Sequence, residues 1–175
     1  MFNAHQDIAV SQLLETLTTN QILHSLDFSP LEFRNLDLSG KFFTGCRFSH
    51  SAFTGVKLDH SHFRMCFFDF ADFTNCTLIE TDIQFCSFAG SQMSETTLKN
   101  SDLLHNNFNG LLASKSSFED SDLYNSRFVM ASLKDVSFQN CNLKKTMFFQ
   151  TTRERVSFKS SNTREALFGK GENPE

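Results

Sequence analysis

The chain has 175 residues, which predicts a single domain, and its formal net charge of −4 argues against a basic surface that binds nucleic acid directly. Its 22 phenylalanines stand beside one tyrosine and no tryptophan, which indicates a large buried aromatic surface without polar groups. The five cysteines include no CxxC pair and do not form an even-numbered disulfide framework, so we expect reduced thiols in a cytoplasmic protein.

The first predicted element is an amphipathic helix over residues 5–18, in which Ile8, Leu13, Leu14 and Leu17 recur at near-helical spacing. We expect residues 1–24 to form a helical cap on one end of the fold, and a helix that binds a partner is the alternative. The N-terminus lacks the basic and continuous apolar regions of a secretory signal peptide. No apolar run approaches 18 residues, so we expect no interaction with a membrane.

From residue 28 to residue 148, every fifth residue is large and apolar, and only Ala113 is not Phe, Leu, Ile or Met. An α-helix repeats near 3.6 residues and a half-buried strand near 2, so neither explains a period of five. A preference for small residues, such as Cys46, Ser61 and Ala71, lies two positions earlier. The repeating unit is therefore small–polar–large–polar–polar.

Residues twenty positions apart share a character, which predicts four such units in each coil of a solenoid. Coils stacked at about 4.8 Å would bring residues twenty apart into contact. One column of large residues is phenylalanine throughout: Phe28, Phe48, Phe68, Phe88, Phe108, Phe128, Phe148 and Phe168.

The motifs SerAspLeu at 101–103 and 121–123 and AlaAspPhe at 71–73 resemble the A(D/N)LXX consensus of the pentapeptide-repeat family. The resemblance implies an all-β solenoid, a right-handed quadrilateral β-helix. The length of the repeat predicts about six to seven coils, and residues 5–18 predict the short N-terminal capping helix. We assign the β-helix to residues 25–168 and a disordered tail to residues 169–175. Arg153 and Thr163 break the pattern near the end, and the resemblance favours a homodimer joined through the C-terminal coils.

Ala113 is the one lapse inside the repeat, and Leu111 occupies the preceding slot, where a small residue is usual. We expect Leu111 to fill the space that Ala113 leaves. A local bulge in the stack is the predicted consequence.

Cys46, Cys66 and Cys86 fall in one predicted column. Stacked thiols suggest metal binding or redox chemistry, but cysteine is also a common small buried residue, and a thiol in apolar surroundings ionises less readily. We favour an inert ladder.

His60 and His62 would lie over Glu80 and Asp82 one coil further on. Two imidazoles and two carboxylates suit a divalent metal, whereas weak surface ion pairs are the alternative. We favour the ion pairs, and the sequence predicts no metal and no cofactor.

Asp82, Asp102 and Asp122 occupy one outward slot in three successive coils. The resembled family contains DNA mimics that bind type II topoisomerases, so this ridge is a candidate site for DNA gyrase or topoisomerase IV. The alternative is that Asp before the central residue bonds nearby backbone amides. Interspersed lysines and arginines and the absence of inserted loops favour the alternative.

Met65, Phe67, Phe70 and Phe85 occupy slots that should face water, and we expect them to cluster around one corner of neighbouring coils. Such a cluster is a candidate protein-binding patch. Alternatively, these side chains fold back onto the cap or onto a neighbouring chain.

No nucleophile lies in a recognisable catalytic context, the sequence has no glycine-rich phosphate loop, and a regular stack should leave no cleft. We therefore predict a non-enzymatic scaffold that binds a protein partner. A DNA mimic that protects a topoisomerase and an effector exported by a bacterium into a host cell are the alternatives that the resemblance leaves open.

Overall fold

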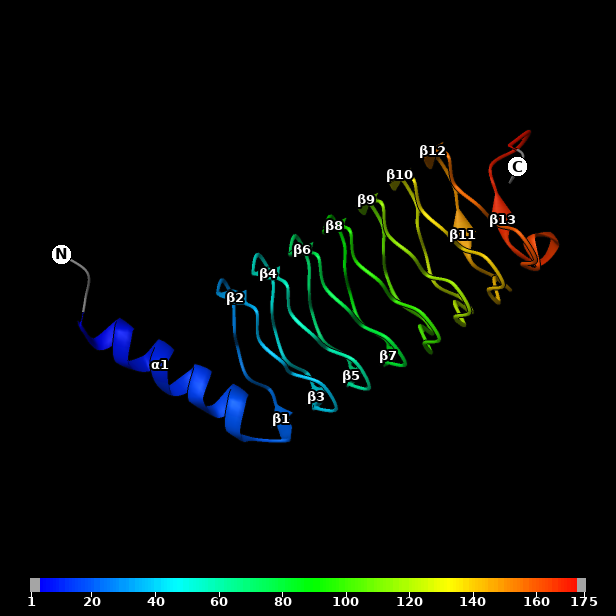
Figure 1. The fold of residues 1–175 in the computed structure, drawn as a ribbon. Helices are drawn as coiled ribbons and strands as arrows, with labels where there is room; N and C mark the ends of the chain where they lie inside the picture. The colour runs from blue at the N-terminus through cyan, green and yellow to red at the C-terminus, as the bar shows by residue number, and fades with distance from the viewer. Residues whose placement is uncertain (1–3, 173–175) are drawn as a thin grey trace.

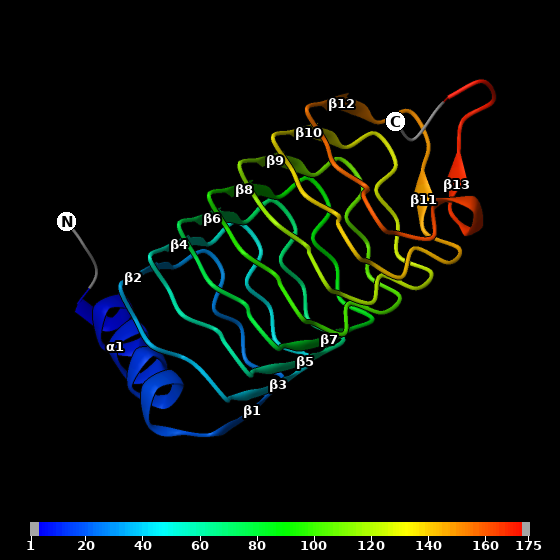
Figure 2. The ribbon, with the colours of Figure 1, turned by 45° about the vertical axis from the view of Figure 1, so that its right-hand side comes forward.

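The computed structural model describes residues 4–172 and shows a right-handed parallel β-solenoid of about seven coils, with one helix at its N-terminal end (Figures 1 and 2). Each coil takes twenty residues, because strand partners lie twenty positions apart, as Phe43 and Phe63 do. The predicted quadrilateral β-helix is confirmed.

Each coil has four faces, and in the first coil each face has one large buried residue at its centre. We number the faces 1 to 4 in chain order. Face 1 begins with Leu23, face 2 with Phe28, face 3 with Phe33 and face 4 with Leu38. From residue 35 to residue 160, the last residue of each pentapeptide turns the corner between two faces with a positive φ, for example 52° at Met65. Non-glycine residues rarely adopt this conformation, and the repeat imposes it at corner after corner.

Faces 1 and 3 carry parallel sheets of four and seven strands. Face 1 contains β1 (Ile22–His24), β3 (Phe42–Thr44), β5 (His62–Arg64) and β7 (Asp82–Gln84). Face 3 contains β2 (Glu32–Arg34), β4 (Ala52–Thr54), β6 (Asp72–Thr74), β8 (Gln92–Ser94), β9 (Leu112–Ser114), β10 (Ser132–Lys134) and β12 (Thr152–Glu154). On face 2, β11 (Met147–Phe148) pairs with β13 (Leu167–Phe168), and elsewhere single bridges connect the coils.

The phenylalanines of face 2 form one continuous stack along the rod. From Phe28 to Phe168, the centroids of successive rings lie 4.7–5.2 Å apart, and their planes are within 17° of parallel. Burying one such side chain stabilises the folded state by about 1.5–3 kcal/mol. The contact between residues twenty apart that the sequence predicts is thus confirmed, and it accounts for the all-phenylalanine column.

The small residues of the repeat are also buried, and their polar groups have partners inside the rod. The Ser61 hydroxyl donates to the Leu38 carbonyl at 3.0 Å, and the Ser101 hydroxyl donates to the Leu78 carbonyl at 3.1 Å. Buried hydroxyls are tolerated when they are hydrogen-bonded in this way.

Ala113 does not disturb the stack. Leu111 is fully buried in the small-residue slot, and β9 pairs with β8 and β10 in unbroken register. The predicted bulge is therefore wrong, because the larger side chain at Leu111 compensates for the smaller one at Ala113 without shifting the backbone.

Helix α1 (Ala4–Thr19) lies at the end of the stack beside the first coil (Figures 1 and 2). Leu17 is fully buried in the core, and Leu13 and Leu14 pack against it. Lys41, which sequence reasoning missed, occupies a small-residue slot, and its ammonium donates to the carbonyls of Thr18 and Asn20 at 3.2 and 2.7 Å. This bond links the end of the helix to the second coil, and the helix caps the stack as predicted. Strand β1 lies inside the range assigned to the cap, so the solenoid begins before residue 25.

The C-terminal coil is closed by its own chain. The Arg153 side chain fills the central slot of face 3, with its guanidinium 5.0 Å from the centroid of the Phe168 ring and 3.5 Å from the Glu172 carboxylate. A short 3-10 helix spans Thr163–Glu165. Residues 169–172 form a turn rather than a disordered tail, and residues 173–175 of the predicted tail lie outside the described residues.

Candidate functional site

The four residues of the predicted apolar patch are all exposed, by 44–61%. Met65 and Phe85 are neighbours at the corner between faces 1 and 2, and Phe67 lies on the adjoining row of face 2. Phe70 lies at the other corner of face 2, five positions after Met65, so the prediction of one shared corner is wrong for Phe70. None of the four is covered by the cap.

Phe70 is held at its own corner by two neighbours. Its ring stacks on the His50 ring at 5.2 Å, and it covers Gly90, where a Cβ atom would lie only 2.6 Å from the ring. Glycine at position 90 therefore makes room for this ring.

Phe85 begins a row of polar and aromatic groups along the corner between faces 1 and 2. Its ring stacks on His105 at 4.8 Å, and His105 Nδ1 lies 2.9 Å from the side-chain nitrogen of Asn125. The Lys145 ammonium lies 3.1 Å from the Tyr124 hydroxyl. A hollow of about 350 Å³ is lined by Phe85, His105, Asn125, Arg127 and Met147.

Two arginines occupy the same row of face 2 as Phe67. Arg47 is one coil before Phe67, and Arg127 is three coils after it. Both are exposed, and neither forms an ion pair with any residue from 10 to 172. We name this surface the aromatic–basic ridge, and it consists of Arg47, Met65, Phe67, Phe85, His105 and Arg127.

The three aspartates of the predicted acidic ridge are neighbours on face 1, but they have different environments. Asp82 is 2.9 Å from the Arg64 guanidinium and 3.7 Å from His62. Asp122 accepts hydrogen bonds from the Tyr124 amide and the Asn142 side chain. Asp102 is exposed. The backbone-amide alternative is thus confirmed for Asp122, and only Asp102 presents a carboxylate without a recorded side-chain partner.

The histidines occupy the positions that the repeat predicts. His60 Nδ1 is 3.3 Å from Glu80, and the His62 ring stacks on Phe42 at 4.3 Å. Within the described part of the chain, no three His, Cys, Asp or Glu side chains are grouped so that they could hold a metal ion.

All five cysteines are free and buried. Burial raises the pKa of the Cys141 thiol to about 12 and also raises the pKa of the Cys76 thiol. For Cys46, the hydrogen bond with Cys66 and then burial raise the thiol pKa. These shifts disfavour the reactive thiolate, in agreement with an inert ladder.

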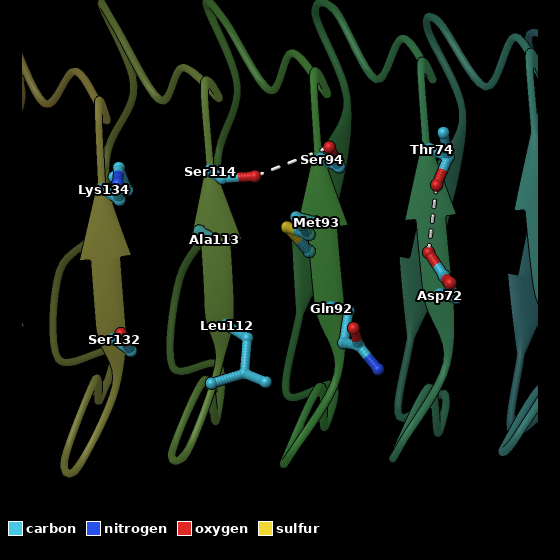
Figure 3. A pocket seen from close by; sticks show the side chains of 10 residues that line it. All are labelled: Asp72, Thr74, Gln92, Met93, Ser94, Leu112, Ala113, Ser114, Ser132 and Lys134. Carbon is cyan, nitrogen blue, oxygen red and sulfur yellow. Dashed lines mark hydrogen bonds between the residues drawn. The ribbon is translucent and has the colours of Figure 1, made fainter.

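A second hollow, of about 390 Å³, lies on the outer surface of face 3 (Figure 3). Its walls carry mainly small polar side chains, including Ser94 and Ser114, whose hydroxyls are 3.4 Å apart. Leu112 is its one exposed large apolar residue. The sequence predicts that the stack leaves no cleft, and this prediction is wrong for its outer surface. Small outward side chains beside larger ones create shallow hollows there.

No helix among residues 4–172 is long and apolar enough to cross a membrane. The family model described as pentapeptide repeat region matches residues 26–103 and 91–168. No curated protein matches the chain.

Three solved structures are among those to which the chain is similar. HetL, a pentapeptide repeat protein involved in heterocyst differentiation regulation in the cyanobacterium Nostoc, is 10% identical over 93% of this chain and 98% of its own, with a TM-score of 0.32. QnrB1, a plasmid-mediated fluoroquinolone resistance protein, is 16% identical over 85% and 89%, with a TM-score of 0.35. Rfr23 from the cyanobacterium Cyanothece is 12% identical over 91% and 99%, with a TM-score of 0.28. On the match of the family model across residues 26–168, together with the twenty-residue coils, the chain belongs to the pentapeptide-repeat family.

Proposed function

We propose that the protein is a non-enzymatic scaffold that binds a protein partner through the aromatic–basic ridge. The observation that carries this proposal is the exposure of Met65, Phe67 and Phe85 side by side on neighbouring coils. Contiguous exposed apolar side chains mark interaction surfaces more often than isolated ones do. Pentapeptide-repeat solenoids are in general structural or binding scaffolds.

The backbone beneath the ridge is rigid, which favours binding. The Met65 amide donates to the Gln84 carbonyl at 3.2 Å, and the Phe67 amide donates to the Cys46 carbonyl at 3.0 Å. The exposed side chains of Met65 and Phe67 therefore extend from a hydrogen-bonded backbone. A surface that is already ordered loses less conformational entropy when a partner binds.

Affinity capture from the native cell tests this proposal. The wild type and the double variant Phe67→Ser/Phe85→Ser are compared with Leu112→Ser, which removes an exposed apolar side chain from face 3 instead. We expect one partner to be retained by the wild type and by Leu112→Ser and to be lost with the double variant. Equal retention by all three proteins would refute the ridge as the docking surface.

A second candidate is a DNA mimic that binds a type II topoisomerase such as DNA gyrase. The exposed carboxylate of Asp102, between Asp82 and Asp122, supports this candidate. A gyrase supercoiling assay with and without quinolone tests it. Protection by the wild type that is lost when all three aspartates become asparagine would support the mimic, and no protection at micromolar protein would remove it.

We also propose that the C-terminal coils join two chains in a homodimer. The support is a hollow of about 420 Å³ near the end of the stack, lined in part by Val156 and Phe158, and the exposed side chain of Leu167. Light scattering should give a mass twice the 20.0 kDa of one chain. A mass of one chain at high micromolar concentration would contradict the dimer. The cytoplasmic location expected from the cysteines stays a prediction.

A further inference from the structure

We propose that the partner segment that docks on the aromatic–basic ridge is an acidic, extended peptide. Its carboxylates face Arg47 and Arg127, and an apolar side chain lies against Phe67 and Phe85. This inference rests on the proposed function, because it assigns the chemistry of the partner that the same surface binds.

The two arginines of the ridge lie beside exposed apolar side chains and form no ion pair with residues 10–172; Lys57 and Lys159 on face 4 likewise form none. Three other lysines pair with carboxylates on neighbouring coils: Lys99 with Glu119 at 2.6 Å, Lys115 with Glu95 at 3.1 Å and Lys134 with Glu154 at 3.3 Å. Arg47 and Arg127 have no such partner among the described residues. An unpaired cation beside exposed apolar groups is a position that a complementary carboxylate of another chain would neutralise.

The outward rows at this corner contain no carboxylate over six coils. The row that turns the corner and the rows on either side of it carry no Asp or Glu from residue 44 to residue 147, and Asp27 lies one coil before Arg47 in its row. The Asp27 carboxylate accepts a hydrogen bond from the Ser29 amide at 2.9 Å. Asp82 pairs with Arg64, and Asp69 accepts hydrogen bonds from the Ala89 amide and the Ser87 hydroxyl. No carboxylate of residues 10–172 forms an ion pair with Arg47 or Arg127.

The hollow beside Arg127 suits a carboxylate that has an apolar neighbour. Its walls combine the guanidinium of Arg127 with the rings of Phe85 and His105 and the thioether of Met147. A guanidinium binds a carboxylate through two parallel hydrogen bonds, and the apolar walls offer contact area to a neighbouring apolar side chain. A glutamate or aspartate flanked by an aliphatic or aromatic residue matches this lining.

The distance between Phe67 and Arg127 along the row predicts how far apart the apolar residue and the carboxylate lie in the partner peptide. Phe67 and Arg127 are three coils apart, through Ser87 and Asn107. At about 4.8 Å per coil this separation is about 14 Å, and an extended peptide rises about 3.3 Å per residue. The apolar anchor and the carboxylate of the partner should therefore be about four residues apart.

Phosphate groups would also neutralise arginines, but two observations disfavour a nucleic acid. Arg47 and Arg127 are four coils apart, about 19 Å at the usual strand spacing, which is too sparse to follow a sugar–phosphate backbone. Phe85 uses one ring face on His105, and Phe70 uses one on His50. Bases stack on open ring faces, and the stacking on histidine leaves at most one face of each of these rings available.

A display library of random nine-residue peptides, selected on the immobilised full chain, tests the proposal. We expect the selected peptides to carry net negative charge and to place an apolar residue about four positions from a carboxylate. A labelled peptide with two phenylalanines and, four residues later, two glutamates should then bind at least tenfold more tightly than the same peptide with glutamines. Selection of neutral or basic peptides, or equal binding of the two labelled peptides, would overturn the acidic partner. Tighter binding of a labelled oligothymidine than of the acidic peptide would also overturn it.

Two pairs of substitutions separate this inference from the proposed function. Arg47→Glu/Arg127→Glu should weaken binding of the glutamate peptide at least tenfold. Lys57→Glu/Lys159→Glu changes the net charge equally on the opposite face and should leave the affinity unchanged. If Phe67→Ser/Phe85→Ser abolishes binding of the library peptides but the arginine variant does not, the docking surface stands and its acidic partner is refuted. If neither variant has an effect, both proposals fail.

Discussion

Phe85 and Phe88 are three residues apart in the same coil, and they illustrate the two regions of this molecule. Phe88 is fully buried in the face 2 stack, between Phe68 and Phe108, whereas Phe85 is 58% exposed at a corner. Phe88 fits the repeat, because its position is a central one that is usually large and apolar. Phe85 departs from the repeat, because its corner position is usually polar. The comparison teaches that adherence to the repeat produces the rod and departures from it mark candidate surfaces.

Substituting aspartate at each of these two positions should separate the regions most sharply. Phe88→Asp removes a ring whose loss alone costs about 3–5 kcal/mol and buries an unpaired charge, against a total stability of about 5–15 kcal/mol. We expect Phe88→Asp to abolish the cooperative thermal transition in circular dichroism. Phe85→Asp should melt within a few degrees of the wild type. A cooperative melt of Phe88→Asp near the wild-type temperature would contradict the account of the core.

The interior could be predicted from the sequence because one side chain in five has the same environment in every coil. The stack from Phe28 to Phe168 and the exposure of Phe85 both follow from position in the repeat. The placement of Phe70 at a separate corner could also have been read from the repeat, since it is five positions after Met65.

Other features could not be predicted, because they depend on contacts that the repeat does not encode. Lys41 finds its partners at the end of α1, and Arg153 lies over Phe168 because the stack ends there. That Arg47 and Arg127 form no ion pair with residues 10–172 could be seen only from the side-chain positions on neighbouring coils.

The next largest effect should come from the exposed rings. Phe67→Ser/Phe85→Ser removes apolar contact area from the ridge but little buried area, so the free energy of unfolding should change by less than about 1 kcal/mol. Binding of the partner should fall at least tenfold. The control is Leu112→Ser, which should change neither quantity. A double variant that binds as tightly as the wild type would place the docking surface elsewhere.

A smaller effect on stability is expected from the row of aspartates on face 1. Replacing Asp82, Asp102 and Asp122 together by asparagine removes the Arg64 ion pair, which is partly exposed and worth about 0–1 kcal/mol. The protein should fold as the wild type does and should bind its ridge partner unchanged. Isothermal titration calorimetry with the ridge partner checks this. Weakened binding would show that the aspartates of face 1 contribute to binding at the aromatic–basic ridge.

The smallest expected effect is a pH dependence of stability, which arises from Glu119 on face 4. The hydrogen bond with Lys99, and then that with Ser137, lowers the pKa of the Glu119 carboxyl below its usual 4.5. Its contribution is therefore present above about pH 4.5 and is lost as the pH falls through the lower folded-state pKa. Glu119→Gln should cost less than about 1 kcal/mol at pH 7 in urea unfolding, and this cost should vanish near pH 2. A cost that is the same at both pH values would mean that the ion pair is not its source.

The central claim, that partners dock on the aromatic–basic ridge, is tested most directly by the methionine methyl groups. Met65 and Met147 lie on or beside the ridge, Met93 is buried in the core, and Met130 is exposed at the other corner of face 2. In methyl-labelled protein titrated with a peptide selected from the library, we expect the resonances of Met65 and Met147 to shift and those of Met93 and Met130 to stay. Shifts at Met130 without shifts at Met65 and Met147 would contradict the claim.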